Sequence, residues 1–168
     1  TMAVEKGLMT LVDQERQAEL MGHLQGHLVG ANHASGGSAG NSMIATALFG
    51  APTFMSCKVA DDADGDIYLA DLEASGVAHS LTNRRGSGTT GKCLVLITPD
   101  AERSMNTYLG VSETLSVAEV DDQAIADSDW VYLEGYLVTS PTGHEAALHT
   151  RQVAEANNVK TAISFSDP

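Results

Sequence analysis

Short apolar runs alternate with amphipathic stretches along most of the chain. Apolar residues at helical spacing, with capping residues at their ends, predict helices at residues 13–28, 43–48, 62–75, 117–126 and 140–157. Shorter apolar runs predict strands at residues 8–12, 53–59, 130–133 and 160–165. The continuous apolar run at 130–133 is typical of a strand covered on both faces. Because strands and helices follow one another in turn, we expect an α/β fold with parallel strands and right-handed crossovers.

The middle of the chain departs from this alternation. Extended segments at residues 78–82, 92–98 and 103–108 follow one another, with turn-like residues between them. No helical pattern separates these segments, and antiparallel strands are the kind that a short turn can join. The sequence therefore predicts a small antiparallel patch inserted into a parallel fold.

The composition is typical of one globular domain. The chain has 168 residues, of which 43% are hydrophobic and 18% are charged. The net charge of -13 argues against nucleic acid or an anionic membrane surface as the main partner. The apolar runs are too short to span a bilayer and no secretion signal opens the chain, so we expect a cytoplasmic protein. Cys57 and Cys93 lie in apolar runs without metal or redox spacing, so we expect buried free thiols.

A glycine-rich segment at residues 86–92 (GSGTTGK) nearly matches a phosphate-binding loop and contains a dinucleotide-binding G-x-G-x-x-G. Both motifs need a helix directly after the glycines, because the helix N-terminus holds the phosphate. The residues that follow are rich in strand formers, and Cys93 stands where a magnesium-binding hydroxyl belongs. We therefore interpret the segment as a flexible hairpin, and the sequence disfavours a nicotinamide-dependent dehydrogenase built on it.

Potential metal ligands occur in three clusters, and none has a complete pattern. His144 and His149 are five residues apart, whereas a zinc-protease helix needs four. His23 and His27 have the four-residue spacing, with a glutamate one turn earlier, but exposed polar positions of a helix are commoner. The acidic residues at 61–66 lack the glycine of a calcium loop and are favoured at a helix N-terminus by its dipole. We therefore expect no metal site.

The segment GGSAGNS at residues 36–42 carries more information. Its two adjacent glycines permit a hinge or a close approach of the backbone to a ligand, and a helix start follows. Backbone N–H groups and the Asn41 amide form a set of donors suited to hydroxyls or anions. These residues alone leave two alternatives, a loop that binds a small polar ligand and a tight connection between elements.

In order along the chain, the motifs resemble those of the ribokinase-like (PfkB-type) carbohydrate and nucleoside kinases. Residues 36–41 are similar to the N-terminal signature of that family, and residues 130–137 (WVYLEGYL) to a core strand. Further similar segments lie at residues 5–13, 48–50, 59–65, 72–77, 89–105 and 164–168. Met43 and Ala60 depart from the family pattern. The pattern has a small residue at the position of Met43 and a glycine at the position of Ala60. The resemblance is nearer to adenosine-kinase-like and sugar-kinase members than to phosphofructokinases.

The resemblance implies a fold and a reaction. The fold is Rossmann-like, a parallel sheet with helices on both faces and a small antiparallel β lid. The lid corresponds to residues 8–12, 78–84 and 91–108, with Thr89, Thr90 and Gly91 as its mobile rim. The reaction transfers the γ-phosphoryl group of ATP, with Mg²⁺, to a hydroxyl group of a sugar or nucleoside.

The resemblance also assigns roles in substrate binding. Gly36 and Gly37 correspond to a double-glycine hinge under the lid, with Gly37 close to the substrate. Asn41 would bind substrate hydroxyls, and Glu134 lies at a strand end close to where some members contact the substrate.

Several family motifs fall outside these residues. A first strand with a substrate-binding aspartate would precede Thr1, and the N-x-x-E and G-A-G-D motifs would follow Pro168. We therefore expect residues 1–168 to be a ribokinase-like domain incomplete at both ends, with no catalytic residue, no bound cofactor and no activity alone. A homodimer through the lid is expected by analogy with relatives. The alternative is a non-catalytic sugar- or nucleoside-binding module or a regulatory remnant.

Overall fold

The computed structural model describes residues 4–25, 33–81 and 85–165. Its helices are α1 (Gln14–Leu24), α2 (Ser38–Leu48), α3 (Ala63–Ala74), α4 (Asp122–Ala126) and α5 (Pro141–Ala156). Short 3-10 helices lie at Gly110–Thr114, Val117–Glu119 and Gly135–Thr139. No helix of the described residues has the length and apolar character needed to cross a membrane.

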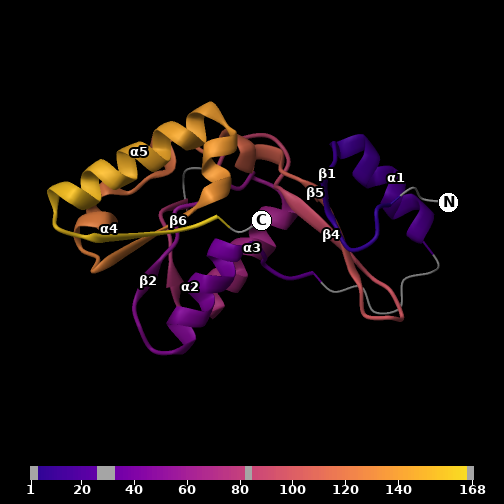
Figure 1. Cartoon of the computed structure of the whole chain (residues 1–168), viewed down its shortest axis with the longest axis horizontal. Helices are drawn as coiled ribbons and strands as arrows, with labels where there is room; N and C mark the ends of the chain where they lie inside the picture. Colours follow the sequence, from indigo (N-terminus) through magenta and orange to yellow (C-terminus); the bar gives the residue numbers. More distant parts are fainter. Residues whose placement is uncertain (1–3, 26–32, 82–84, 166–168) are drawn as a thin grey trace.

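The strands form three small sheets. They are β1 (Met9–Leu11), β2 (Thr53–Phe54), β3 (Val77–Ala78), β4 (Lys92–Ile97), β5 (Arg103–Tyr108), β6 (Trp130–Glu134) and β7 (Lys160–Ser164). β2 pairs in parallel with β3, and β6 in parallel with β7, each pair joined through a helix. The alternating pattern predicts the second pair, whereas residues 78–82 were expected in the antiparallel patch. The third sheet has the order β1-β5-β4. In Figure 1 this three-stranded sheet and α1 lie to one side of the molecule, and α2, α4, α5, β2 and β6 to the other.

Most helix ends lie close to where capping residues predict them, but α2 begins at Ser38 and not at the predicted residue 43, so residues 38–42 of the expected loop are helical. The side chains of Asp13, Asp62 and Ser140 each accept a hydrogen bond from a first-turn N–H of α1, α3 and α5. Gly76 has a positive φ of 79° directly after the C-cap of α3, as expected for a C′ glycine. The predicted helix at 117–126 is divided into a 3-10 turn and α4, because Val120 has an extended backbone. The last residues of the predicted helix 13–28 fall outside the described residues.

Two apolar clusters hold the helices against the strands. The larger contains Cys57, Val59, Leu69, Leu72, Val77 and Leu81, with partly buried residues of α2 packed against it. The smaller contains Ile125, Ala154 and Val159 and joins α4 to α5. The larger cluster therefore fixes α2, whose first turn follows the double glycine, relative to α3.

The three-stranded sheet differs from the expected lid in two respects. Residues 8–12 and 91–108 contribute its strands, but residue 78 belongs to β3, which pairs with β2 in the body of the fold. The apolar side chain of Val77 explains this, since it is 2% exposed within the larger apolar cluster. Residues 82–84 lie outside the described residues. The sheet is also mixed, because β4 runs antiparallel to β5 whereas β1 runs parallel to it.

Two expectations about burial are wrong. Cys57 is buried, but Cys93 is exposed on β4. The apolar run at 130–133 suggested a strand covered on both faces, yet Trp130 is 60% exposed, with the Lys160 ammonium 5.0 Å from its ring centre. In both cases an apolar run indicated a strand correctly, but strand pairing and not local pattern decides which face is covered.

Candidate substrate-binding groove

The double glycine and α2 form the first wall of the candidate site. Gly37 is the N-cap of α2, with φ 85° and ψ 144°, a conformation that residues with a side chain rarely adopt. Its carbonyl accepts the backbone N–H of Asn41 at 2.9 Å, so Asn41 lies on the first turn with its side chain exposed. No side chain caps α2, and its first-turn N–H groups are therefore not occupied by a capping residue.

A close approach at Gly40 fixes the orientation of α2. A Cβ at this position would lie 2.9 Å from the Tyr68 hydroxyl oxygen, which comes from α3. Burial raises the pKa of Tyr68 far above its ordinary value, and the neighbouring Cys57 adds to this shift. Tyr68 therefore stays neutral, and it packs under the first turn of α2.

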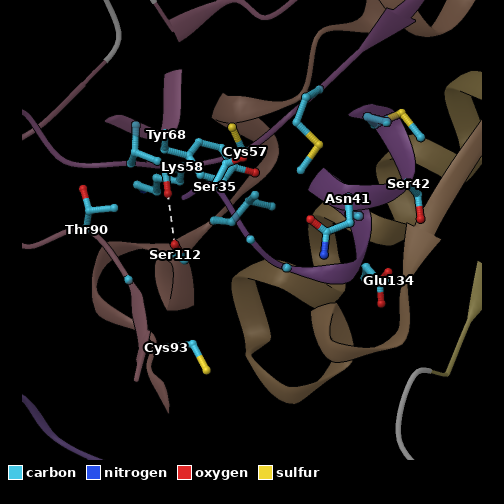
Figure 2. Close-up of a pocket in the computed structure, with 18 of the residues that line it drawn as sticks. Ser35, Asn41, Ser42, Cys57, Lys58, Tyr68, Thr90, Cys93, Ser112 and Glu134 are labelled. Atoms are coloured by element: carbon cyan, nitrogen blue, oxygen red, sulfur yellow. Dashed lines mark hydrogen bonds between the residues drawn. The ribbon is translucent and has the colours of Figure 1, made fainter. Parts of the chain in front are cut away.

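Glu134 lies beside Asn41. It is the last residue of β6, at the carboxyl end of a parallel strand, where ligands bind in open α/β folds. The Tyr132 hydroxyl donates to its Oε1 atom at 2.8 Å, which restrains the carboxylate. Figure 2 shows the Asn41 amide and the Glu134 carboxylate close to each other, one from α2 and the other from β6. Together they offer an N–H donor and carboxylate acceptors suited to hydroxyl groups.

An open groove runs from these two residues to the three-stranded sheet. Its lining includes every residue that the sequence assigns to the substrate or to the lid rim: Gly36, Gly37, Thr89, Thr90, Gly91, Asn41 and Glu134. Cys93 and other residues of β4 line the opposite wall (Figure 2). The structure thus brings segments far apart in the sequence to one cleft.

Comparison with known proteins identifies the family to which the chain belongs. The model of the pfkB family of carbohydrate kinases matches residues 8–168. The chain belongs to the pfkB family. No curated protein sequence matches this pfkB-family chain, whereas many solved structures do.

Two of the matching structures come from rhizobial bacteria. An adenosine kinase from Sinorhizobium meliloti is 37% identical, with a TM-score of 0.86 over 98% of this chain and 49% of its own. A probable sugar kinase from Rhizobium etli CFN 42 is 36% identical, with a TM-score of 0.87 over 99% of this chain and 49% of its own. The present pfkB-family chain therefore spans about half the length of these relatives.

More distant structures share the fold alone. An adenosine kinase from Schistosoma mansoni, in complex with adenosine, is 20% identical, with a TM-score of 0.81 over 98% of this chain and 48% of its own. The α/β architecture of the pfkB-family chain is thus that of ribokinase-like kinases.

Residues 89–91 of this pfkB-family chain, expected to form a mobile rim of the lid, are held by hydrogen bonds and close contacts. Thr90 is only 4% exposed, and its backbone N–H donates to the Asp62 carboxylate at 2.8 Å. Its hydroxyl donates to the same carboxylate at 2.5 Å and accepts the Ala60 N–H at 3.0 Å. A Cβ on Gly91 would overlap the carbonyl oxygen of Leu109. At Thr90, the expected mobile rim is an anchored segment.

The glycine-rich segment of this pfkB-family chain is not a phosphate-binding loop. β4 begins at Lys92, so a strand and not a helix follows the glycines directly, and Gly86 forms a parallel bridge with Ala60. The segment therefore lacks the helix of a dinucleotide site, and it is not a simple hairpin, because its bridge partner Ala60 lies well before it in the sequence.

Within the described residues, no three histidine, cysteine or acidic side chains are grouped to hold a metal ion. His149 lies 2.7 Å from Asp122, and Glu19 lies 3.7 Å from His23, whereas His27 falls outside the described residues. The acidic residues at 61–66 pair instead with Arg85 and Lys92.

Sequence reasoning missed the residues that brace the groove from the far side. The Lys58 ammonium donates to the Thr114 carbonyl at 2.9 Å and lies 3.1 Å from Glu119. The Ser112 hydroxyl donates to the Lys58 carbonyl at 3.0 Å, the dashed line in Figure 2. Burial acts to raise the pKa of Glu119, but the Lys58 and Ser116 hydrogen bonds outweigh it and lower this pKa. Only the pattern of Ser116 and Glu119, a capping box, could have signalled part of this arrangement.

Proposed function

We propose that the chain is the substrate-binding half of a sugar or nucleoside kinase, which phosphorylates a substrate hydroxyl with ATP. The observation that carries the proposal is that Asn41 and Glu134 line one groove, which the three-stranded sheet also lines. In this proposal the sheet is the lid, and the two parallel strand pairs belong to one Rossmann-like sheet.

The polar groups of the groove suit an uncharged, hydroxylated ligand. The Asn41 amide can donate to one hydroxyl, and the Glu134 carboxylate can accept from it or from its neighbour. Gly36 and Gly37 present backbone without side chains, so a ring can approach the start of α2 closely. The apolar residues of β4 supply a surface for the carbon face of a sugar or a base.

ATP and Mg²⁺ are the phosphoryl donor and metal of the proposed reaction. We assign none of the described residues to them, because the glycine-rich segment leads into β4 and the acidic residues of α3 are paired with cations. Residues 1–168 alone are accordingly expected to bind substrate without turnover. We extend the proposal to a homodimer through the lid, because β1 and β4 are the outer strands of their sheet.

A binding experiment on the purified chain tests the first part. Adenosine, ribose and fructose are titrated separately, and binding is followed by calorimetry and by thermal unfolding, since a ligand of the native state raises stability. Asn41→Ala should weaken binding about 3- to 10-fold, the usual effect of one lost hydrogen bond. Gln152→Ala removes an exposed amide of α5 outside the groove and should leave affinity unchanged. Equal affinities for both variants would contradict the proposed site.

A second experiment separates an enzyme from a binding module. The longer protein that contains this chain is assayed for ATP-dependent phosphorylation of whichever ligand binds. We expect phosphorylation by the longer protein and no phosphorylation by residues 1–168 alone. Binding without turnover in both would favour a non-catalytic sugar- or nucleoside-binding module, and turnover by residues 1–168 alone would refute the division of roles.

A further inference from the structure

Helix α3 makes contacts that the groove does not explain. The acidic cluster at 61–66 spans its N-cap and first turn, and these carboxylates bind residues of the segment that leads into the three-stranded sheet. Figure 1 shows α3 near the junction between that sheet and the rest of the molecule.

The first connection is the glycine-rich segment, which is fastened to α3 at both of its ends. At one end, the Arg85 guanidinium lies 2.6 Å from Asp66 and also donates to the carbonyls of Ala60 and Asp62. At the other end, the Lys92 ammonium lies 2.5 Å from Asp64. The segment therefore cannot swing freely on its glycines.

The strongest attachment lies between these ends, at Thr90. The Asp62 carboxylate accepts the N–H and the hydroxyl of Thr90 while also accepting the Gly65 N–H at 2.8 Å. Burial alone would raise the pKa of Asp62, but the hydrogen bonds from Thr90 and Gly65 outweigh it and hold this pKa below its ordinary value. The single side chain of Asp62 thus caps α3 and also binds Thr90, two residues before β4 begins.

The other connections join the same block. The N–H of Ser35, directly before the double glycine, donates to the Asp71 carboxylate of α3 at 2.6 Å. On the return from β5, the Val111 N–H donates to the Thr89 carbonyl at 2.9 Å, and a Cβ on Gly110 would overlap that carbonyl oxygen. Three connections of the sheet to the body thus reach α3, two directly and one through Thr89.

We propose that α3 is the hinge block of the lid and that Asp62 is a positioning residue for lid closure, acting through Thr90. The proposal rests on the lid role proposed above. It locates the pivot beyond the anchored residue Thr90, so β4 and β5 rotate as one unit while residues 85–90 stay with the body. The acidic cluster then determines the orientation of the lid before closure. Gly36 and Gly37 permit backbone rotation only in the connection that follows α1.

Thr90→Val and Thr90→Ser form a matched pair for testing this hinge. Valine has the shape of threonine but leaves the Ala60 N–H and the Asp62 carboxylate without the hydroxyl, whereas serine restores both hydrogen bonds. Ser140→Ala is the control, because it removes an N-cap of α5 that lies outside the groove and destabilises the fold globally.

Amide hydrogen exchange without any ligand is the first readout. Thr90→Val should raise exchange across β4 and β5 about tenfold relative to β6, the effect of leaving a buried polar group unpaired. Thr90→Ser should restore exchange to the wild-type rate, and Ser140→Ala should not change the ratio of β4 to β6. Unchanged exchange in β4 for Thr90→Val, or an equal rise in Ser140→Ala, would overturn the proposal. If Thr90→Val accelerates exchange throughout the chain, the variant is unfolded and a second one is needed. Asp62→Asn keeps one acceptor oxygen, and its ratio of exchange in β4 to exchange in β6 then decides the proposal.

Adenosine affinity is the second readout. Thr90→Val should weaken adenosine binding about tenfold, Thr90→Ser should restore it, and Ser140→Ala should bind as wild type despite its lower stability. If wild type binds no adenosine, ribose or fructose, the proposed function fails, while the exchange experiment still decides the hinge. If ligand binds and Thr90→Val does not alter its affinity, Asp62 and Thr90 have no positioning role.

Discussion

Replacing Gly37 by alanine tests whether backbone conformation, and not contact, defines the start of the groove. Gly37 has φ 85° and ψ 144°, and a Cβ there would meet no atom within 4 Å. The cost of Gly37→Ala is therefore backbone strain alone, on the order of 1–3 kcal/mol for a region that is nearly exclusive to glycine. Gly36 also has open space around its Cβ position but lacks a positive φ. Gly36→Ala should change stability by less than about 1 kcal/mol, and in the stabilising direction if the unfolded chain loses entropy.

Urea unfolding of both variants measures this difference directly. For a chain of 168 residues, each kcal/mol corresponds to a shift in melting temperature of about 2–4 °C, so a thermal scan is a second measure. Gly37→Ala should lower the urea midpoint without changing the slope, because the surface exposed on unfolding stays the same.

Equal stabilities for Gly36→Ala and Gly37→Ala would refute the reasoning. Such a result would mean that the connection into α2 adopts another conformation in solution and that the N-terminus of α2 is not fixed against the groove. A fall in stability for Gly36→Ala alone would exchange the roles of the two glycines.

Three further predictions concern other parts of the chain. At pH 8, a thiol reagent should label Cys93 rapidly and Cys57 only on unfolding, because burial raises the pKa of the Cys57 thiol to about 12; the time course of labelling measures this. The lowered pKa values of Asp62 and Glu119 mean that their stabilisation is present above their ordinary values of 3.8 and 4.5 and is lost as pH falls through the lowered ones. Urea unfolding at pH 6 and pH 3 should show this loss, reduced in Asp62→Asn. Gly110→Ala, with a φ of 55° and an overlap with the Thr89 carbonyl, should cost about 3 kcal/mol or more in the same assay.

The sequence predicts the features that depend on near neighbours. Asp13 and Ser140 act as N-caps and Gly76 as a C′ residue, because a cap needs only the three or four residues beside it. The alternation of strands and helices likewise follows from local periodicity. Asn41 and Glu134 were identified through the resemblance to a family, and both line the groove.

The features that the sequence did not reveal depend on partners far along the chain. Ala78 pairs with Phe54 and not with β4, and no pattern within residues 78–84 distinguishes the two choices. Cys93 is exposed because the face of β4 that carries it lines an open groove, whereas its apolar neighbours suggested burial. Thr90 looked like a loop residue among glycines, and its burial becomes visible only once Asp62 is placed opposite it.

The acidic cluster shows how a local signal can conceal a longer-range role. Asp62, Asp64 and Asp66 suit the first turn of a helix, and that interpretation is correct for α3. A helix dipole needs only one or two such charges, however, and the remaining carboxylate oxygens are bonded to Thr90, Lys92 and Arg85. These three partners belong to the one segment that leads into β4. A capping residue that also binds the segment before β4 couples the start of a helix to the placement of a sheet, and the proposed hinge role of α3 depends on this coupling.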